Sequence, residues 1–107
     1  MAYAIIHHFP GGTKTQYEAT LAVVHGSKTA LPKGQMFHVA GPSAGGYTIV
    51  AIHDTKQSWE QFRDKTLLPK LKAGIAGGFT GQPIETTFEV ENSLAGTLPC
   101  RSTTLAC

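Results

Sequence analysis

The stretch from Gly34 to Asp54, GQMFHVAGPSAGGYTIVAIHD, restricts the possible folds of this chain more than any other. Two runs rich in β-branched and aromatic residues, MFHVA and YTIVAIH, flank a segment of turn-forming residues, GPSAGG. This order predicts a β-hairpin. His38 and His53 lie within the two apolar runs, so they are the first candidates for polar groups in an apolar interior.

The residues before the hairpin predict one strand and one helix. Residues 3–8, YAIIHH, form the strand, which ends at a proline and two glycines. Thr13 and Gln16 match a capping box, and apolar residues then recur at helical spacing through about His25. Gly26 ends this helix, and His25 is expected to be exposed on it.

The residues after the hairpin predict a second helix and a last strand. Asp54 and Thr55 offer N-cap oxygens for a helix that runs to about Thr66, and residues 67–71 form a further short helical turn with Pro69 near its first position. After a glycine-rich loop, residues 83–91 alternate as a strand. Its expected buried residues are Ile84, Phe88 and Val90, and its expected solvent-facing residues are Glu85, Glu89 and Glu91.

The order strand, helix, strand, strand, helix, strand predicts an α+β fold. It is the ferredoxin-like βαββαβ arrangement, a four-stranded antiparallel sheet with two helices on one face. At 107 residues the chain forms one domain, predicted over residues 1–94, followed by a tail at residues 95–107 that is expected to be mobile or to lie across a partner subunit. The first and third strands are apolar on both faces, so a second copy is expected to cover the bare face of the sheet as a homodimer.

Composition excludes several classes of partner. The net charge is +2 with two arginines, and the basic residues near the second helix lack interleaved exposed aromatics, so nucleic-acid binding is not expected.

The N-terminal apolar run is too short for a signal peptide or a membrane span, which favours a cytoplasmic protein. Cys100 and Cys107 both lie in the tail and are expected to be free thiols without a catalytic role.

Three segments resemble a known family: PGGTKTQY, GQMFHVAGPSAGGYTIVAIHDTKQSWEQFRDKTLLPKL and EVEN. They look like the antibiotic-biosynthesis-monooxygenase-like proteins of the dimeric α/β barrel superfamily, and more narrowly its small bacterial members with an FHVAG histidine. The resemblance implies a homodimer with facing sheets and a pocket in each subunit between sheet and helices. Family members include cofactor-independent oxygenases of polycyclic phenols, haem-degrading proteins, and cyclases or isomerases. The strand asparagine that pairs with a tryptophan in several of these oxygenases has no counterpart, because the sole asparagine is Asn92.

His38 and His53 are the candidate catalytic residues. His38 has apolar neighbours, and burial would favour the neutral form that accepts a proton near neutral pH; the alternative is a core histidine bonded to the backbone. His53 precedes the second helix, whose dipole would lower its pKa. Its neighbour Asp54 is expected to cap that helix rather than to take part in catalysis.

His7 and His8 are adjacent in the first strand, so their side chains should point to opposite faces of the sheet. One of them could join His38 across the sheet. Strand pairing is not readable from one sequence, so which of the four histidines share a pocket stays open. No metal site is predicted, because an adjacent pair on opposite faces cannot clamp a metal by itself.

Tyr17, Trp59 and Phe62 should line the side of the sheet that faces the helices. They either pack as core or form the walls of a pocket for a small, flat, apolar or aromatic ligand. The leading hypothesis is a cofactor-independent monooxygenase or cyclase in which a histidine deprotonates an aromatic, polyketide-like substrate, without metal or flavin. The alternative is a non-catalytic ligand-binding or accessory protein on the same scaffold.

Overall fold

The structure, a computed structural model, describes residues 1–27 and 30–96. All but two residues of the predicted tail, including Cys100 and Cys107, lie outside this description. Within the described residues no helix is long and apolar enough to cross a membrane.

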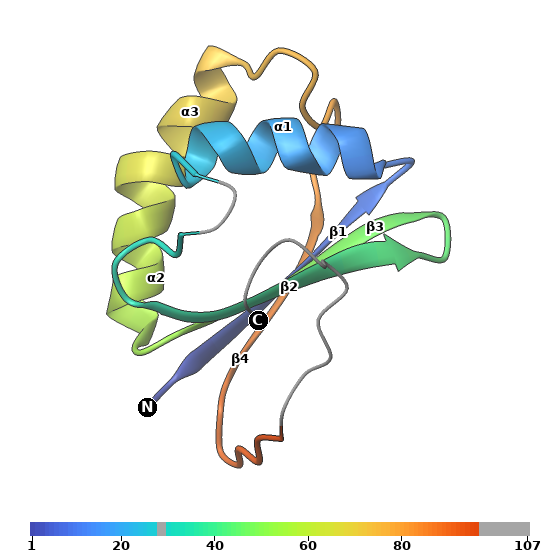
Figure 1. Ribbon diagram of the computed structural model, residues 1–107. Coiled ribbons are helices and arrows are strands. Elements are labelled where there is room, and N and C mark those ends of the chain that lie inside the picture. The colour runs from blue at the N-terminus through green and yellow to red at the C-terminus, as the bar shows by residue number, and fades with distance from the viewer. Residues whose placement is uncertain (28–29, 97–107) are drawn as a thin grey trace.

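The described chain is a four-stranded antiparallel sheet with its helices on one side (Figure 1). The strand order is β2-β3-β1-β4. This confirms the predicted α+β, ferredoxin-like arrangement. The elements are β1 (Tyr3–Pro10), α1 (Lys14–Val24), β2 (Gln35–Ser43), β3 (Gly46–His53), α2 (Lys56–Phe62), the π-helical turn η1 (Arg63–Leu67), α3 (Leu68–Ala73) and β4 (Ile84–Glu89).

Side-chain caps fix where the two main helices begin. Thr13 and Gln16 form the predicted capping box at α1, because the Thr13 hydroxyl accepts from the Gln16 amide and the Gln16 side chain accepts from the Thr13 amide. Thr55 caps α2 by accepting from the backbone N–H of Ser58 at 3.0 Å. The expectation that Asp54 caps this helix is therefore wrong, since the exposed Asp54 lies one residue before the cap.

The second helix continues farther than the sequence predicted. Instead of ending near Thr66 and restarting, the chain stays helical from α2 through η1 into α3. Pro69 is the cause we assign to the wide turn, because its ring crowds the carbonyl four residues earlier, at Lys65, and it has no N–H to donate. The π-helical turn thus absorbs the proline without ending the helix.

The sheet has two faces of different character. The side chains of Ile5, His7 and Phe9 face the helices, whereas Ala4, Ile6 and His8 face the open side. On β4, Glu85 and Glu89 are exposed as predicted, although Glu85 pairs with His7 on the helix side. Ile84 and Phe88 are 61% and 50% exposed on the open side. The prediction that Ile84 and Phe88 are buried is wrong for a single chain, because no helix or strand of the described residues covers that face (Figure 1).

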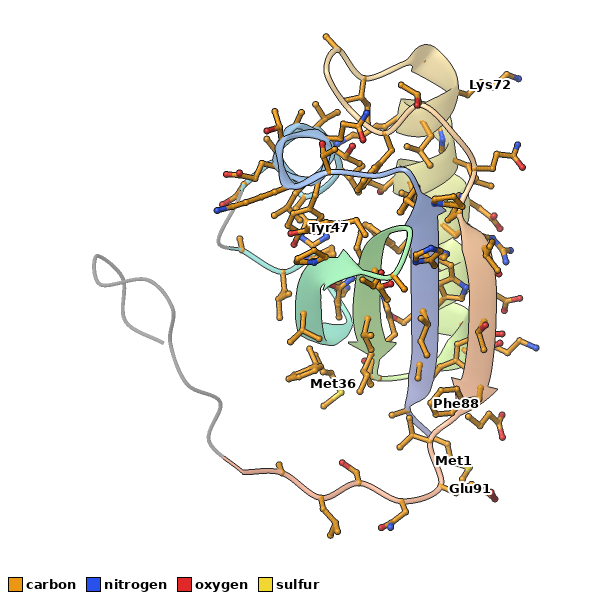
Figure 2. The ribbon with its side chains drawn as sticks, turned by 90° about the vertical axis from the view of Figure 1, so that its right-hand side faces the viewer. Met1, Met36, Tyr47, Lys72, Phe88 and Glu91 are labelled. Atoms are coloured by element: carbon orange, nitrogen blue, oxygen red, sulfur yellow. The ribbon has the colours of Figure 1, made fainter. Side chains whose placement is uncertain are left out.

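The hairpin of β2 and β3 is longer than predicted. Its pairing continues through Pro42 and Ser43 to Gly46, so only Ala44 and Gly45 form the turn. Proline is tolerated here because β2 is an edge strand. Figure 2 shows Tyr47 at this end of the sheet, and Met36 and Phe88 toward the opposite end, on the two edge strands.

Candidate functional site

A cavity of about 850 Å³ lies between the sheet and the helices. Its walls include all three aromatic residues predicted to face the helices, namely Tyr17, Trp59 and Phe62. Trp59 is 4% exposed, and its ring lies 6.2 Å from that of Phe62. Tyr17 stacks on Tyr47 with ring centroids 5.2 Å apart. A cavity of this size with aromatic walls suits a small apolar ligand.

A continuous chain of five polar side chains runs from this cavity into the core. The Tyr17 hydroxyl lies 2.6 Å from His38 Nε2, and His38 Nδ1 lies 3.0 Å from Gln35 Oε1. Gln35 Nε2 lies 3.2 Å from His53 Nε2, and His53 Nδ1 lies 3.1 Å from Ser58 Oγ. The structure therefore brings both predicted catalytic histidines into one network, bridged by a glutamine that sequence reasoning did not single out.

A β-bulge at Met36 makes this bridge possible. Gln35 pairs with His53 and Phe37 with Ile52, so Met36 is an extra residue in β2. Gln35 and His38 are three residues apart and would point to opposite faces of a regular strand. The bulge places both on the helix side, where Gln35 is 7% exposed and His53 is fully buried.

The placement of the glutamine amide sets the direction of every hydrogen bond in the chain. Because Gln35 Oε1 can only accept, His38 carries its proton on Nδ1 and accepts the Tyr17 hydroxyl proton at Nε2. Because Gln35 Nε2 can only donate, His53 accepts at Nε2 and donates from Nδ1 to Ser58. The amide thus fixes His53 as neutral, and each imidazole has a hydrogen-bond partner at both nitrogens.

Burial keeps the histidines of this network neutral. It lowers the pKa of His38 to about 4, and the nearby His25 adds to this shift. The pKa of His53 is also lowered, first by burial and then by His25, with Asp54 acting against the shift. The predicted direction for His53 is confirmed, but burial is the largest cause and the helix dipole is not needed to explain it.

Tyr17 stays protonated at any physiological pH. Burial raises its pKa to about 12, and the neighbouring Tyr47 and Glu18 contribute to the same direction. A neutral phenol beside a neutral imidazole leaves this end of the cavity polar but uncharged. Such a pair can take a proton from a ligand hydroxyl, because the Tyr17 oxygen can accept the ligand O–H while its own proton passes to His38 Nε2.

His25 also belongs to the site, which corrects the expectation that it is exposed. It lines the cavity, and its ring meets that of His38 edge to face with centroids 5.0 Å apart. Its Nδ1 lies 3.1 Å from the carbonyl oxygen of Ala30, so this nitrogen donates. Burial lowers the pKa of His25, which keeps a second positive charge away from His38.

The first strand contributes a separate polar pair to the same cavity. His7 and His8 point to opposite faces, as predicted from their adjacency. His7 lies on the cavity side, where its Nε2 is 2.8 Å from Glu85 Oε2 on β4. His8 lies on the open side, where its Nδ1 is within 3.1 Å of the Ser43 and Thr48 hydroxyl oxygens.

The sequence held at most one signal for the missed residues. Gln35 is a polar residue at the start of an apolar strand, but only the bulge turns it inward. Glu85 and His7 are far apart in sequence and are joined by the β1–β4 register, which single-sequence patterns do not encode. Among the described residues no three histidine, cysteine or acidic side chains are grouped so that they could hold a metal ion.

Comparisons with known proteins support the fold. No protein-family model matches the chain, and no curated protein matches it. Among solved structures the chain is similar to Rv0793 from Mycobacterium tuberculosis, with a TM-score of 0.65 and 15% sequence identity over 89% of this chain and 100% of that one. At this level of identity the likeness shows the fold alone.

Proposed function

We propose that this protein binds a flat, mainly apolar small molecule in the cavity and moves a proton on that molecule at the Tyr17–His38 pair. The observation that carries the proposal is the polar chain that opens into an aromatic-walled cavity at these two residues. Pockets that combine apolar walls with a few convergent polar groups are the usual form of small-molecule sites.

His38 is the proton acceptor in this proposal, and Gln35, His53 and Ser58 hold it in place. The fixed Nδ1–H leaves Nε2 as the nitrogen that accepts, either directly or through the Tyr17 hydroxyl. A histidine with a pKa of about 4 is a weak base on its own. The ligand anion left beside it would stabilise the imidazolium, so proton transfer is coupled to binding of an acidic phenol, enol or carbon acid.

The finer proposal is a cofactor-independent monooxygenase or a cyclase. In the first case the deprotonated carbon adds O₂ and loses water, so that a CH₂ group becomes a carbonyl and the substrate supplies all the electrons. In the second case the carbanion attacks a carbonyl carbon of the same molecule, and the resulting alkoxide takes the proton back. Both reactions begin with the same proton transfer, which a general base accelerates by about two to four orders of magnitude.

Oxygen uptake and product analysis with hydroxylated polycyclic aromatics test this proposal. A substrate identified this way should be turned over at least about a hundredfold more slowly by His38→Gln, which keeps a polar side chain but not the base. A loss confined to KM would assign His38 to binding. Ligand binding without oxygen uptake or product would instead support the non-catalytic alternative.

We also propose that the protein is a homodimer joined through the open face of its sheet. One row of side chains crosses all four strands on this face, and it is apolar throughout: Phe37, Ile52, Ala4 and Phe88. Phe37 is 37% exposed and Phe88 is 50% exposed. A second copy related by a two-fold axis would cover the apolar patch of both subunits at once, because the same patch of each subunit contacts that of the other.

A further inference from the structure

His7 and Glu85 form a second acid–base pair that the proposed function leaves unused. They lie in one row of the sheet, on β1 and β4, and their side chains meet at 2.8 Å. The side chains are 14% exposed for His7 and 46% exposed for Glu85. Both residues line the same cavity as Tyr17 and His38.

The orientation of His7 leaves one nitrogen available to a ligand. A carboxylate can only accept, so Nε2 of His7 carries the proton that is donated to Glu85. Its ring contacts two aromatic rings edge to face, with centroid separations of 5.8 Å to Trp59 and 6.3 Å to Phe9. In the described part of the chain His7 makes no other hydrogen bond, so its Nδ1 has no partner. Every buried side-chain nitrogen or oxygen in that part does have a partner, so Nδ1 cannot be one of the buried atoms. Nδ1 is therefore an accessible lone pair on a residue that lines the cavity.

The two polar pairs differ in how well they hold a positive charge. A proton added to His38 enters a buried network beside His25. A proton added to His7 at Nδ1 is balanced by the Glu85 carboxylate, which solvent reaches. Charge-assisted hydrogen bonds of this kind are stronger than neutral ones and fix the tautomer of the base.

Strand geometry separates the two pairs by a distance that a small ligand can span. His38 on β2 pairs with Ala51 on β3, which pairs with Ile5 on β1. His7 is therefore two strands away from His38 and two residues beyond Ile5 along β1. With about 4.8 Å between strands and about 3.3 Å per residue, the two backbone positions lie about 12 Å apart. The inward-pointing side chains shorten the gap between their polar atoms.

We propose that His7 and Glu85 form a second proton-accepting dyad, which removes the hydroxyl proton of an elongated, flat phenol whose other end places an oxygen at Tyr17 and His38. This proposal rests on the proposed cavity binding and names the ligand class more closely. In the step, the ligand O–H bond breaks, an N–H bond forms at His7 Nδ1, and the electron pair stays on the phenolate oxygen. No oxidant or reductant is required.

A dye with a phenol at one end and a carbonyl at the other, 7-hydroxycoumarin, tests the dyad directly. Its phenol and phenolate absorb at different wavelengths, so absorbance reports where the proton is. At a pH where the free dye is a phenol, the dye bound to the wild-type protein should show the absorption band of the phenolate. The bound phenolate-to-phenol ratio should fall at least about tenfold in His7→Asn and about threefold or more in Glu85→Gln, since a tenfold change corresponds to about 1.4 kcal/mol.

Glu89→Gln is the matched control, because Glu89 lies on the same face of β4 as Glu85 but pairs with Tyr3, four residues away from His7, and should leave the ratio unchanged. An unchanged ratio in both dyad variants, with the dye still bound, would overturn the dyad and leave cavity binding intact. Absence of any quenching of Trp59 by the dye in the wild type would overturn both proposals.

If His7→Asn does not fold, Glu85→Gln decides, together with ¹⁵N chemical shifts of the wild-type His7 ring. Those shifts should show the proton on Nε2, and a proton on Nδ1 would contradict the dyad.

Discussion

Gln35 and His38 meet at 3.0 Å on the same face of β2 although they are three residues apart in sequence. The extra residue at Met36 brings them together and also places the Gln35 amide 3.2 Å from His53. One bulge therefore joins a cavity-facing pair to the buried histidine. Bulges that redirect a side chain in this way are common beside functional sites.

Replacing Gln35 with leucine should destabilise the protein by about 1–3 kcal/mol, because it leaves His38 Nδ1 and His53 Nε2 without partners in a buried place. Urea unfolding measures this as a lower midpoint with an unchanged slope. The same substitution at the exposed Gln57 on α2 is the control and should change stability by less than about 0.5 kcal/mol. Equal effects at the two sites would show that the bridge does not stabilise the fold.

Gly34 should tolerate alanine poorly for two separable reasons. Its φ of +85° strains any side chain, and an added Cβ would collide with the Ser58 hydroxyl that His53 contacts. Gly26 has a φ of +70° but open space around it, so Gly26→Ala measures the strain alone. We expect Gly34→Ala to cost at least about 1 kcal/mol more than Gly26→Ala in thermal or urea unfolding, because the collision adds to the strain. Identical losses would mean that Ser58 moves aside freely.

Stability should fall as the pH falls from about 6.5 to about 4. The folded state keeps His38, His53 and His25 neutral at a pH where the unfolded chain protonates its histidines, so the unfolded state binds more protons in this range. His38 alone accounts for a loss of at most about 3 kcal/mol. Urea unfolding across this range should show a shallower pH dependence in His38→Gln than in the wild type. Parallel curves for the two proteins would remove His38 as the titrating group.

The fold was predictable from the sequence because each element carried its own signal. The β-branched runs of the hairpin, the Thr13 capping box and the helical spacing around Trp59 are local patterns, and all three elements are present in the structure. The sequence also placed Tyr17, Trp59 and Phe62 on the helix side of the sheet, but it left open whether they pack as core or line a cavity.

The connections within the site were not predictable, because they depend on strand register and on one bulge. His7 and Glu85 meet only through the pairing of β1 with β4, and Gln35 turns inward only because Met36 is extra. The expectation that His25 is exposed failed because the cavity lies under the end of α1, where β2 brings His38 against it. The exposure of Ile84 and Phe88 reflects a sheet face that no helix or strand in the described part of the chain covers.

Phe88→Lys should weaken self-association through the open sheet face. A lysine there would bring a charge into an apolar interface, and we expect the dissociation constant measured by sedimentation to rise at least about tenfold, equivalent to about 1.4 kcal/mol. Leu31→Lys is the matched control, since Leu31 is 48% exposed but lies in the loop before β2. A wild-type chain that sediments as a monomer at micromolar concentration would contradict the homodimer itself.

Quenching of Trp59 by a hydroxylated polycyclic aromatic is the most direct test of the central claim that the cavity binds a flat small molecule. Trp59 is the sole tryptophan and lines the cavity, so its emission reports on this site alone. We expect saturable quenching with one ligand per chain, and its loss in Ala51→Phe, which places a large ring on the cavity floor. Val39→Phe, on the open face of the neighbouring strand, should bind as the wild type does. Quenching that never saturates, or that persists unchanged in a folded Ala51→Phe variant, would contradict the assignment of this cavity as the binding site.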